Sequence, residues 1–204
     1  MRLEAVNLGK RFNTEWIFRK LEFSFEPGKI YAVVGPNGSG KSTLLKVLWG
    51  QLPPTTGEVR LYINGSLVPA SDCYQHTAIA TPYMDLIEEF TLREMISFHF
   101  KFKKVRENLP IDEIIARLEF EAAIDKNIGS FSSGMKQRLK LGLAFFSDTP
   151  LLFLDEPSTN LDEAANRWYH SLLGQAGART IIIASNQNDE YPANAIKLNI
   201  TSFR

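Results

Sequence analysis

The sequence predicts an α/β fold with a mainly parallel sheet, an N-terminal antiparallel β portion and an inserted helical subdomain. Short apolar runs, typical of strands buried on both faces, occur at residues 30–34, 151–154 and 180–184. Helical segments lie between these runs, and strands that alternate with helices favour a parallel sheet. From about residue 84 to residue 130, strand-like runs give way to apolar residues at helical spacing.

Local signals justify the individual elements. Residues 21–26 alternate apolar and polar side chains, which is typical of a half-buried strand. Asn64-Gly65, between two further strand-like runs, is a strong hairpin signal. Residues 42–49 and 132–147 lack helix breakers and have apolar residues for a buried face, so both are predicted to be helices.

These elements predict one domain with two lobes. We expect a core lobe at about residues 1–83 and 148–204, and a helical lobe at about residues 84–147. A chain of 204 residues is long enough to bury a substantial core in this arrangement.

Composition limits the classes of function. The 23 Lys and Arg residues balance 23 Asp and Glu residues, so no nucleic-acid partner is expected. The single cysteine, Cys73, cannot form an internal disulfide, which fits a reducing compartment. No signal peptide is evident, and no apolar run approaches the ~20 residues that span a bilayer. We therefore expect a soluble, cytoplasmic chain that only another chain could hold at a membrane.

Residues 35–43 fit the pattern G-x-x-x-x-G-K-[ST], between a predicted strand and a predicted helix. Glycines allow backbone N–H groups to surround a phosphate, and the helix points the positive end of its dipole at it. Lys41 adds positive charge toward the β- and γ-phosphates, and the Ser42 hydroxyl can ligate Mg²⁺. The alternative is a glycine-rich turn with a surface lysine, which this context disfavours. The predicted ATP-binding residues of this P-loop NTPase core are Gly35, Pro36, Asn37, Gly38, Ser39, Gly40, Lys41, Ser42 and Thr43.

An acidic pair, Asp155-Glu156, follows the apolar run at residues 151–154. In open α/β sheets ligands bind beyond the carboxyl ends of the strands, which places this pair near the phosphates. We expect Asp155 to hold Mg²⁺ and Glu156 to polarise the attacking water. Alone the pair is a weak signal, because an Asp-Glu pair also occurs in solvated loops.

Residues 131–138, Phe-Ser-Ser-Gly-Met-Lys-Gln-Arg, resemble the LSGGQ signature motif of the ATP-binding cassette (ABC) family. Ser132 and Gly134 match the motif, whereas Ser133 replaces its first glycine. In that family two cassettes pack head to tail around two ATP molecules, so the resemblance implies that Ser132, Ser133 and Gly134 contact a partner's nucleotide. A simple N-cap serine is the alternative. The resemblance covers nearly the whole chain and leaves open whether the second cassette is identical.

The resemblance also assigns roles to isolated residues. Phe12 stands where the family has an adenine-stacking aromatic; Trp16 is a rival, and either could belong to the core. Asp162 lies in a segment that resembles the family's D-loop. Two positions depart from the family. Tyr83 stands at a usual Gln, and Asn186 stands at a usual His, where it can donate a hydrogen bond but carry no charge.

With Lys41, Glu156 and Asn186 as catalytic residues, we expect a slow ATPase that uses ATP and Mg²⁺. The resemblance implies a subunit that drives a separate membrane permease at the cytoplasmic face, with residues 83–90 as the candidate coupling surface. A soluble non-transport ABC ATPase, for example one acting in assembly, is the alternative. A small-molecule kinase would leave residues 132–138 unexplained.

Overall fold

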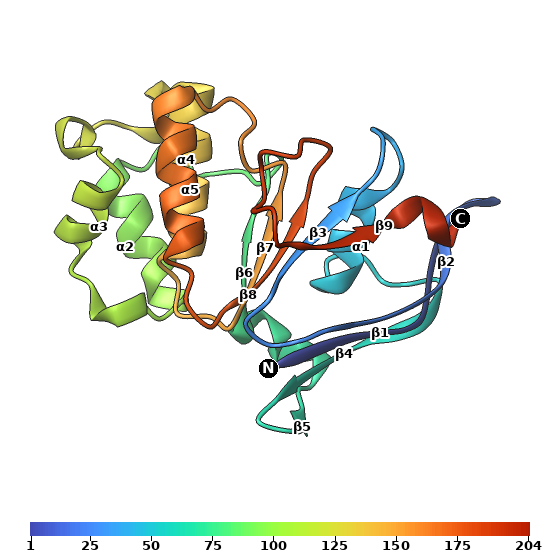
Figure 1. The fold of residues 1–204 in the computed structure, drawn as a ribbon. Helices are drawn as coiled ribbons and strands as arrows, with labels where there is room; N and C mark the ends of the chain where they lie inside the picture. Colours follow the sequence, from blue (N-terminus) through green and yellow to red (C-terminus); the bar gives the residue numbers. More distant parts are fainter. The chain divides into compact units, whose positions relative to one another are not determined.

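The computed structural model describes residues 1–204, and contacts divide them into two units (Figure 1). The first unit comprises Met1–Thr77, Pro150–Glu156 and Gly177–Arg204. The second comprises Ala78–Thr149 and Pro157–Ala176. None of the helices combines the length and apolar character that crossing a membrane requires.

An antiparallel sheet forms the first part of the first unit, as predicted. Its strands lie in the order β2-β1-β4-β5. Asn64 and Gly65 connect the last two strands with positive φ angles of 50° and 82°, as a tight hairpin turn requires. The strand bounds are Arg2–Phe12 for β1, Glu15–Phe25 for β2, Thr56–Ile63 for β4 and Ser66–Leu67 for β5.

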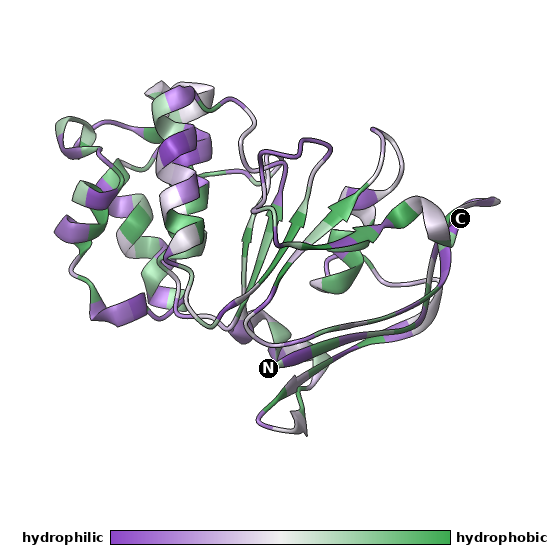
Figure 2. Ribbon diagram, in the orientation of Figure 1, coloured by the Kyte–Doolittle hydropathy of each residue, from purple (hydrophilic) through white to green (hydrophobic).

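A parallel sheet forms the rest of the first unit, with strands in the order β7-β8-β3-β9. Strands β7 and β8 are buried along their whole length, and both are coloured as hydrophobic in Figure 2. The strand bounds are Ile30–Val34 for β3, Leu151–Asp155 for β7, Thr180–Ala184 for β8 and Ile196–Asn199 for β9, and helix α1 spans Lys41–Leu48.

The second unit is mainly helical. Its core contains fully buried side chains such as Ile96, Ile114 and Leu139, from three different helices. Helix α2 begins with a capping box, in which the Thr91 hydroxyl accepts from the Glu94 N–H and the Glu94 carboxylate accepts from the Thr91 N–H. The helix bounds are Leu92–Phe102 for α2, Ile111–Arg117 for α3, Ser133–Phe145 for α4 and Glu163–Gly174 for α5.

Shorter elements complete the chain. Strand β6, Thr77–Ala80, begins at the last residue of the first unit's opening segment and continues into the second unit. Turns of 3₁₀ helix occur at Ala70–His76, Arg106–Asn108, Glu121–Ala123, Ile128–Ser130 and Ile200–Phe203.

Helix α5 groups with the helical unit, whereas the predicted core lobe, residues 1–83 and 148–204, includes its residues. The reason lies in two large apolar side chains on one face of the helix. Trp168 and Leu172 pack against the helical core, and Trp168 Nε1 donates to the Arg117 carbonyl at 2.8 Å. Spacing within α5 predicts an apolar face but not which core that face covers.

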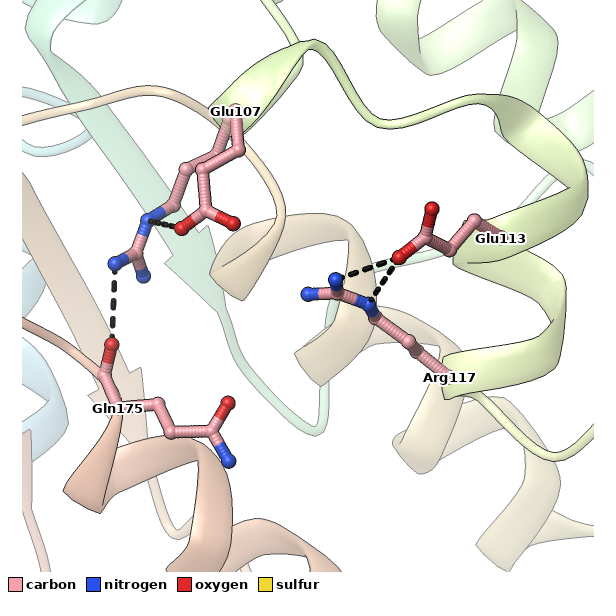
Figure 3. Close-up of polar contacts among 5 residues, drawn as sticks. Glu107, Glu113, Arg117 and Gln175 are labelled. Carbon is pink, nitrogen blue, oxygen red and sulfur yellow. Dashed lines mark hydrogen bonds and ion pairs between the residues drawn. The ribbon is translucent and has the colours of Figure 1, made fainter.

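Two arginines make polar contacts at the end of α5 and within α3 (Figure 3). Arg106 Nη2 donates to the carbonyl of Gln175, the C-cap of α5, at 3.1 Å, and its Nε lies 3.4 Å from Glu107 Oε1. Arg117 pairs with Glu113 one turn earlier on α3 at 2.6 Å. A cation at a helix C-terminus complements the helix dipole, so the first contact stabilises the end of α5.

Candidate nucleotide site

The loop between β3 and α1 takes a shape that only glycine permits at one position. Gly40 precedes α1 with φ 102°, and a Cβ there would lie 2.2 Å from Ile17 Cγ2. Gly38 also has positive φ, 73°, but faces open space. Ile17 belongs to β2, so the β1–β2 hairpin packs directly against the loop. This contact was not predicted, because nothing in the spacing links Ile17 to Gly40.

The ammonium of Lys41 turns back onto its own loop. Its Nζ donates to the Gly35 and Pro36 carbonyls at 3.0 and 3.2 Å, and the residue is almost fully buried. Ser39 is also buried, and its hydroxyl has no hydrogen-bond partner. A buried polar atom without a partner is costly, and both groups lie in a loop suited to an anion.

Ser42 and Asp155 meet at the carboxyl end of β7. The Ser42 hydroxyl donates to Asp155 Oδ1 at 2.9 Å, while Oδ2 is buried without a partner. Asp155 is 1% exposed, and burial raises the pKa of its carboxyl to about 6, although the Ser42 hydrogen bond opposes the shift. A hydroxyl beside a buried, incompletely bonded carboxylate is a donor set that fits Mg²⁺.

Glu156 and Asn186 follow neighbouring parallel strands of the same unit. Glu156 has φ 44°, and its N–H donates to the Ala184 carbonyl at 2.9 Å, which fixes the start of its side chain. Asn186 Nδ2 donates to Asn37 Oδ1 of the phosphate loop at 2.7 Å. The structure therefore brings Asp155 to Ser42 and Asn186 to Asn37 of the loop at residues 35–43, which also carries Lys41, and Glu156 follows Asp155 directly in the chain.

A buried pair supports the segment that holds Asn186. The Ser185 hydroxyl donates to the Glu190 carboxylate, and both residues are almost fully buried. Ser185 also accepts from the Gln187 N–H at 2.8 Å. Sequence reasoning missed this pair, because two polar residues five positions apart in a loop carry no periodic signal.

The two candidate adenine-stacking residues have different surroundings. Phe12 ends β1 and is 47% exposed. Trp16 is the cross-strand neighbour of Arg11, whose guanidinium lies over the indole at 5.4 Å, and its ring packs on Gly9. Phe12 thus presents a free aromatic surface, whereas Trp16 covers its own sheet.

The signature-like residues lie at one pocket within the second unit. Ser132 is the N-cap of α4 and accepts from the Met135 N–H at 3.2 Å; Ser133 and Gly134 form the first turn. Asp162 is the N-cap of α5 and accepts from the Ala165 N–H at 2.8 Å. These residues line the same pocket, so two helix N-termini meet there.

Two contacts link the starts of α4 and α5, and the sequence alone does not predict them. Gln137 is buried on α4, and its Nε2 donates to the Pro157 carbonyl at 3.0 Å. A Cβ on Gly134 would lie 2.7 Å from the Asn160 carbonyl oxygen. Glycine here therefore allows the close approach of the Pro157–Asp162 segment, which no local pattern reveals.

Two lysines one turn apart on α4 contact the segment 83–90 and the residue that precedes it. Lys136 Nζ lies 2.5 Å from Glu88 Oε1, and Lys140 Nζ donates to the Pro82 carbonyl at 2.7 Å. Burial lowers the pKa of Lys140, and nearby Asp85 opposes that shift. Tyr83, at the start of the segment, is 76% exposed.

Comparisons with known proteins identify the family of the chain. The family model described as ABC transporter matches residues 18–159. An uncharacterized ABC transporter ATP-binding protein, YybJ of Bacillus subtilis (strain 168), is 31% identical over 191 residues, covering 92% of this chain and 87% of that protein. The cytochrome c biogenesis ATP-binding export protein CcmA of Brucella abortus (strain 2308) is 34% identical over 176 residues, 85% of this chain and 79% of that protein.

The Nod factor export ATP-binding protein I of Rhizobium sp. (strain N33) is 32% identical over 197 residues; the match covers 92% of this chain but only 64% of that longer protein. A solved putative ABC transporter ATP-binding protein from Pyrococcus furiosus has a TM-score of 0.82 at 22% identity, covering 100% of this chain and 99% of its own. The fold and site define a P-loop ATPase core. The chain belongs to the ABC transporter family, among its ATP-binding proteins.

Proposed function

We propose that this chain is the ATP-hydrolysing subunit of a membrane transporter. The observation that supports this best is the Ser42–Asp155 contact, with a buried Asp155 Oδ2 left unbonded beside the phosphate loop. Such a carboxylate oxygen is costly to bury, and a divalent cation that accompanies ATP would satisfy it.

Binding uses groups that already surround the loop. Backbone N–H groups of the phosphate loop (Pro36 has none) and the N-terminus of α1 attract the phosphates. Lys41 exchanges loop carbonyls for phosphate oxygens. Adenine stacks on Phe12. Ser42 and Asp155 would hold Mg²⁺, which when bound neutralises negative charge on the phosphate oxygens.

Hydrolysis needs a positioned water and little covalent help from the protein. Glu156 polarises that water, and its fixed backbone limits where its carboxylate can reach. Asn186 donates a hydrogen bond to the γ-phosphate but brings no positive charge, so we expect slow hydrolysis.

Single-turnover hydrolysis of Mg·ATP tests this role of Glu156. A Glu156→Gln variant keeps the side-chain shape but cannot act as a carboxylate, so its rate should fall by at least about tenfold while it still binds ATP. Equal rates in the two chains would refute hydrolysis through Glu156. A Lys41→Ala variant, which should lose ATP binding, separates a binding defect from a chemical one.

The pocket at Ser132, Ser133, Gly134 and Asp162 is proposed to receive the nucleotide of a second cassette. Two helix N-termini meet at this pocket, and such termini favour anions. The chain already has a phosphate loop of its own, so this second anion site suits a head-to-tail dimer. A homodimer is the simplest assembly.

The partner in transport is proposed to be a separate permease that meets residues 83–90 on the cytoplasmic face of a membrane. Exposed Tyr83 and the attachment of this segment to α4 support the choice. The names of two relatives refer to export, which favours an exporter. Co-purification from detergent extract should yield a multi-span membrane protein that cross-links to a Tyr83→Cys variant. Recovery of a soluble partner alone would instead support a non-transport ABC ATPase.

A further inference from the structure

Lys10 is a buried lysine without a carboxylate partner. It is 8% exposed, lies two residues before Phe12 on β1, and takes part in none of the ion pairs of the molecule. Burying an ammonium is costly unless other groups replace its water. Strand formation alone does not explain why a lysine is buried at this position.

Two groups replace that water. Lys10 Nζ donates to the Pro53 carbonyl at 2.8 Å, and it lies over the Phe12 ring, 5.2 Å from the centroid. A cation at this distance from a ring face is attracted by the negative face of the π system. Lys10 is buried and Phe12 is 47% exposed, so the ammonium lies over one face of a ring that still presents aromatic surface to solvent.

The loop at Pro53–Thr55, whose Pro53 carbonyl accepts from Lys10, is itself bonded to β1. The Arg11 N–H donates to Thr55 Oγ1 at 3.0 Å, and the Thr55 N–H donates to the Gly9 carbonyl at 2.8 Å. This loop follows α1, and the phosphate loop leads into the N-terminus of the same helix. The contacts around Lys10 therefore connect the ammonium over the Phe12 ring to the segment that follows the phosphate loop and α1.

We infer that Lys10 is a positioning residue for the adenine base: it holds the Phe12 ring with one face covered and the opposite face open for stacking. The inference rests on the proposed adenine site at Phe12. It assigns adenine recognition to a pair of residues, of which Lys10 touches the ring and not the nucleotide.

Binding of Mg·ATP and of magnesium tripolyphosphate, measured by calorimetry, tests the inference, because only ATP carries a base. All chains carry Glu156→Gln, so that ATP is not consumed. We expect Lys10→Met to weaken ATP binding about threefold to tenfold and to leave tripolyphosphate binding unchanged. Lys10→Arg, which keeps the cation, should restore ATP binding. Lys29→Met, at an exposed lysine, is the matched control and should change neither affinity.

The outcomes separate the two claims. If Phe12→Ala leaves the ratio of the two affinities unchanged, the proposed adenine site is wrong. If Phe12→Ala lowers that ratio but Lys10→Met does not, the inference about Lys10 alone is wrong. Equal losses for both ligands would also overturn it, since a merely structural role predicts that result. In the Phe12→Ala chain, Lys10→Met should have no further effect on the ratio.

A second substitution covers the case in which Lys10→Met does not fold. Lys10→Gln can still donate to the Pro53 carbonyl but has no charge over the ring. A lowered ratio in Lys10→Gln supports the inference, and an unchanged ratio overturns it.

Discussion

At the scale of single residues, the site buries a carboxylate in surroundings that disfavour its negative charge. Asp155 is buried beside the end of β7, and burial raises its pKa to about 6. At pH 7 the ionised side chain is thus less stable in the folded chain than in the unfolded one. The chain tolerates this cost because the same carboxylate is the proposed ligand for Mg²⁺.

An Asp155→Asn variant should therefore be more stable than the natural chain and inactive. We expect its free energy of unfolding at pH 7 without nucleotide to rise by about 1–3 kcal/mol, since a shift of one pKa unit is worth about 1.4 kcal/mol. Urea unfolding measures the gain, and ATP hydrolysis measures the loss. A variant that is both less stable and inactive would contradict the argument.

His99 makes stability depend on pH in the helical unit. Its Nε2 lies 3.0 Å from Ser147 Oγ, and burial, with Lys103 nearby, lowers its pKa to about 4. Between the ordinary pKa of about 6.5 and pH 4 the unfolded chain binds a proton that the folded chain does not. Stability therefore falls as the pH drops through this window.

We expect the free energy of unfolding to lose about 1–3 kcal/mol from His99 between pH 7 and pH 4. In His99→Gln this part of the pH dependence should disappear, whereas His170→Gln, at an exposed histidine, should retain it. Denaturant midpoints of both variants, measured from pH 7 to pH 4, test this expectation. If the free energy of unfolding of His99→Gln falls with pH as steeply as that of the unsubstituted chain, other groups cause the acid sensitivity.

At the scale of elements, two helical glycines allow the effect of side-chain packing on stability to be distinguished from that of helix propensity. Gly142 lies within α4, where a Cβ would come 2.3 Å from Leu118 Cδ2. Gly174 is the last residue of α5, and no atom lies within 4 Å of a Cβ there. The same substitution should therefore have opposite effects in the two helices.

Gly174→Ala should stabilise the chain by about 0.5–1 kcal/mol, because alanine favours helix over glycine. Gly142→Ala has the same local gain but must displace Leu118, so we expect a net loss of about 1–2 kcal/mol. Thermal unfolding of the two variants tests the difference. Stabilisation by both would mean that Leu118 moves freely and that α4 is loosely packed.

Local signals explain which elements the sequence could predict. Strands β3, β7 and β8 are continuous apolar runs, and the phosphate loop and acidic pair lie directly at strand ends. Strand β9 was missed, because only Leu198 of its four residues is buried. Contacts such as Ile17–Gly40 join distant segments, and no local pattern encodes them.

At the scale of the whole molecule, the two units separate the proposed chemistry. The first unit holds the phosphate loop and acidic pair, and the second holds the pocket at Ser132–Asp162. If that pocket serves a second copy, one chain's loop must act with the other chain's pocket. Two chains with different defects would then complement each other.

Mixing Lys41→Ala with Ser133→Glu tests this arrangement. Ser133 is exposed in the first turn of α4, where a glutamate suits the helix dipole but would repel a partner's triphosphate. Each variant alone should hydrolyse little ATP. In a mixed dimer one site keeps both an intact loop and an intact pocket, so mixing should restore activity. No recovery on mixing would favour a site completed within one chain.

The resting contacts of the site have a consequence for the thermodynamics of ligand entry. Lys41 is bonded to loop carbonyls, Ser42 to Asp155, and Asn186 to Asn37. When a nucleotide binds these groups, nearly every hydrogen bond that it forms replaces a hydrogen bond within the protein. Ligand entry is then an exchange of partners, whose enthalpy nearly cancels, and the affinity depends on the displaced water and on the stacked base.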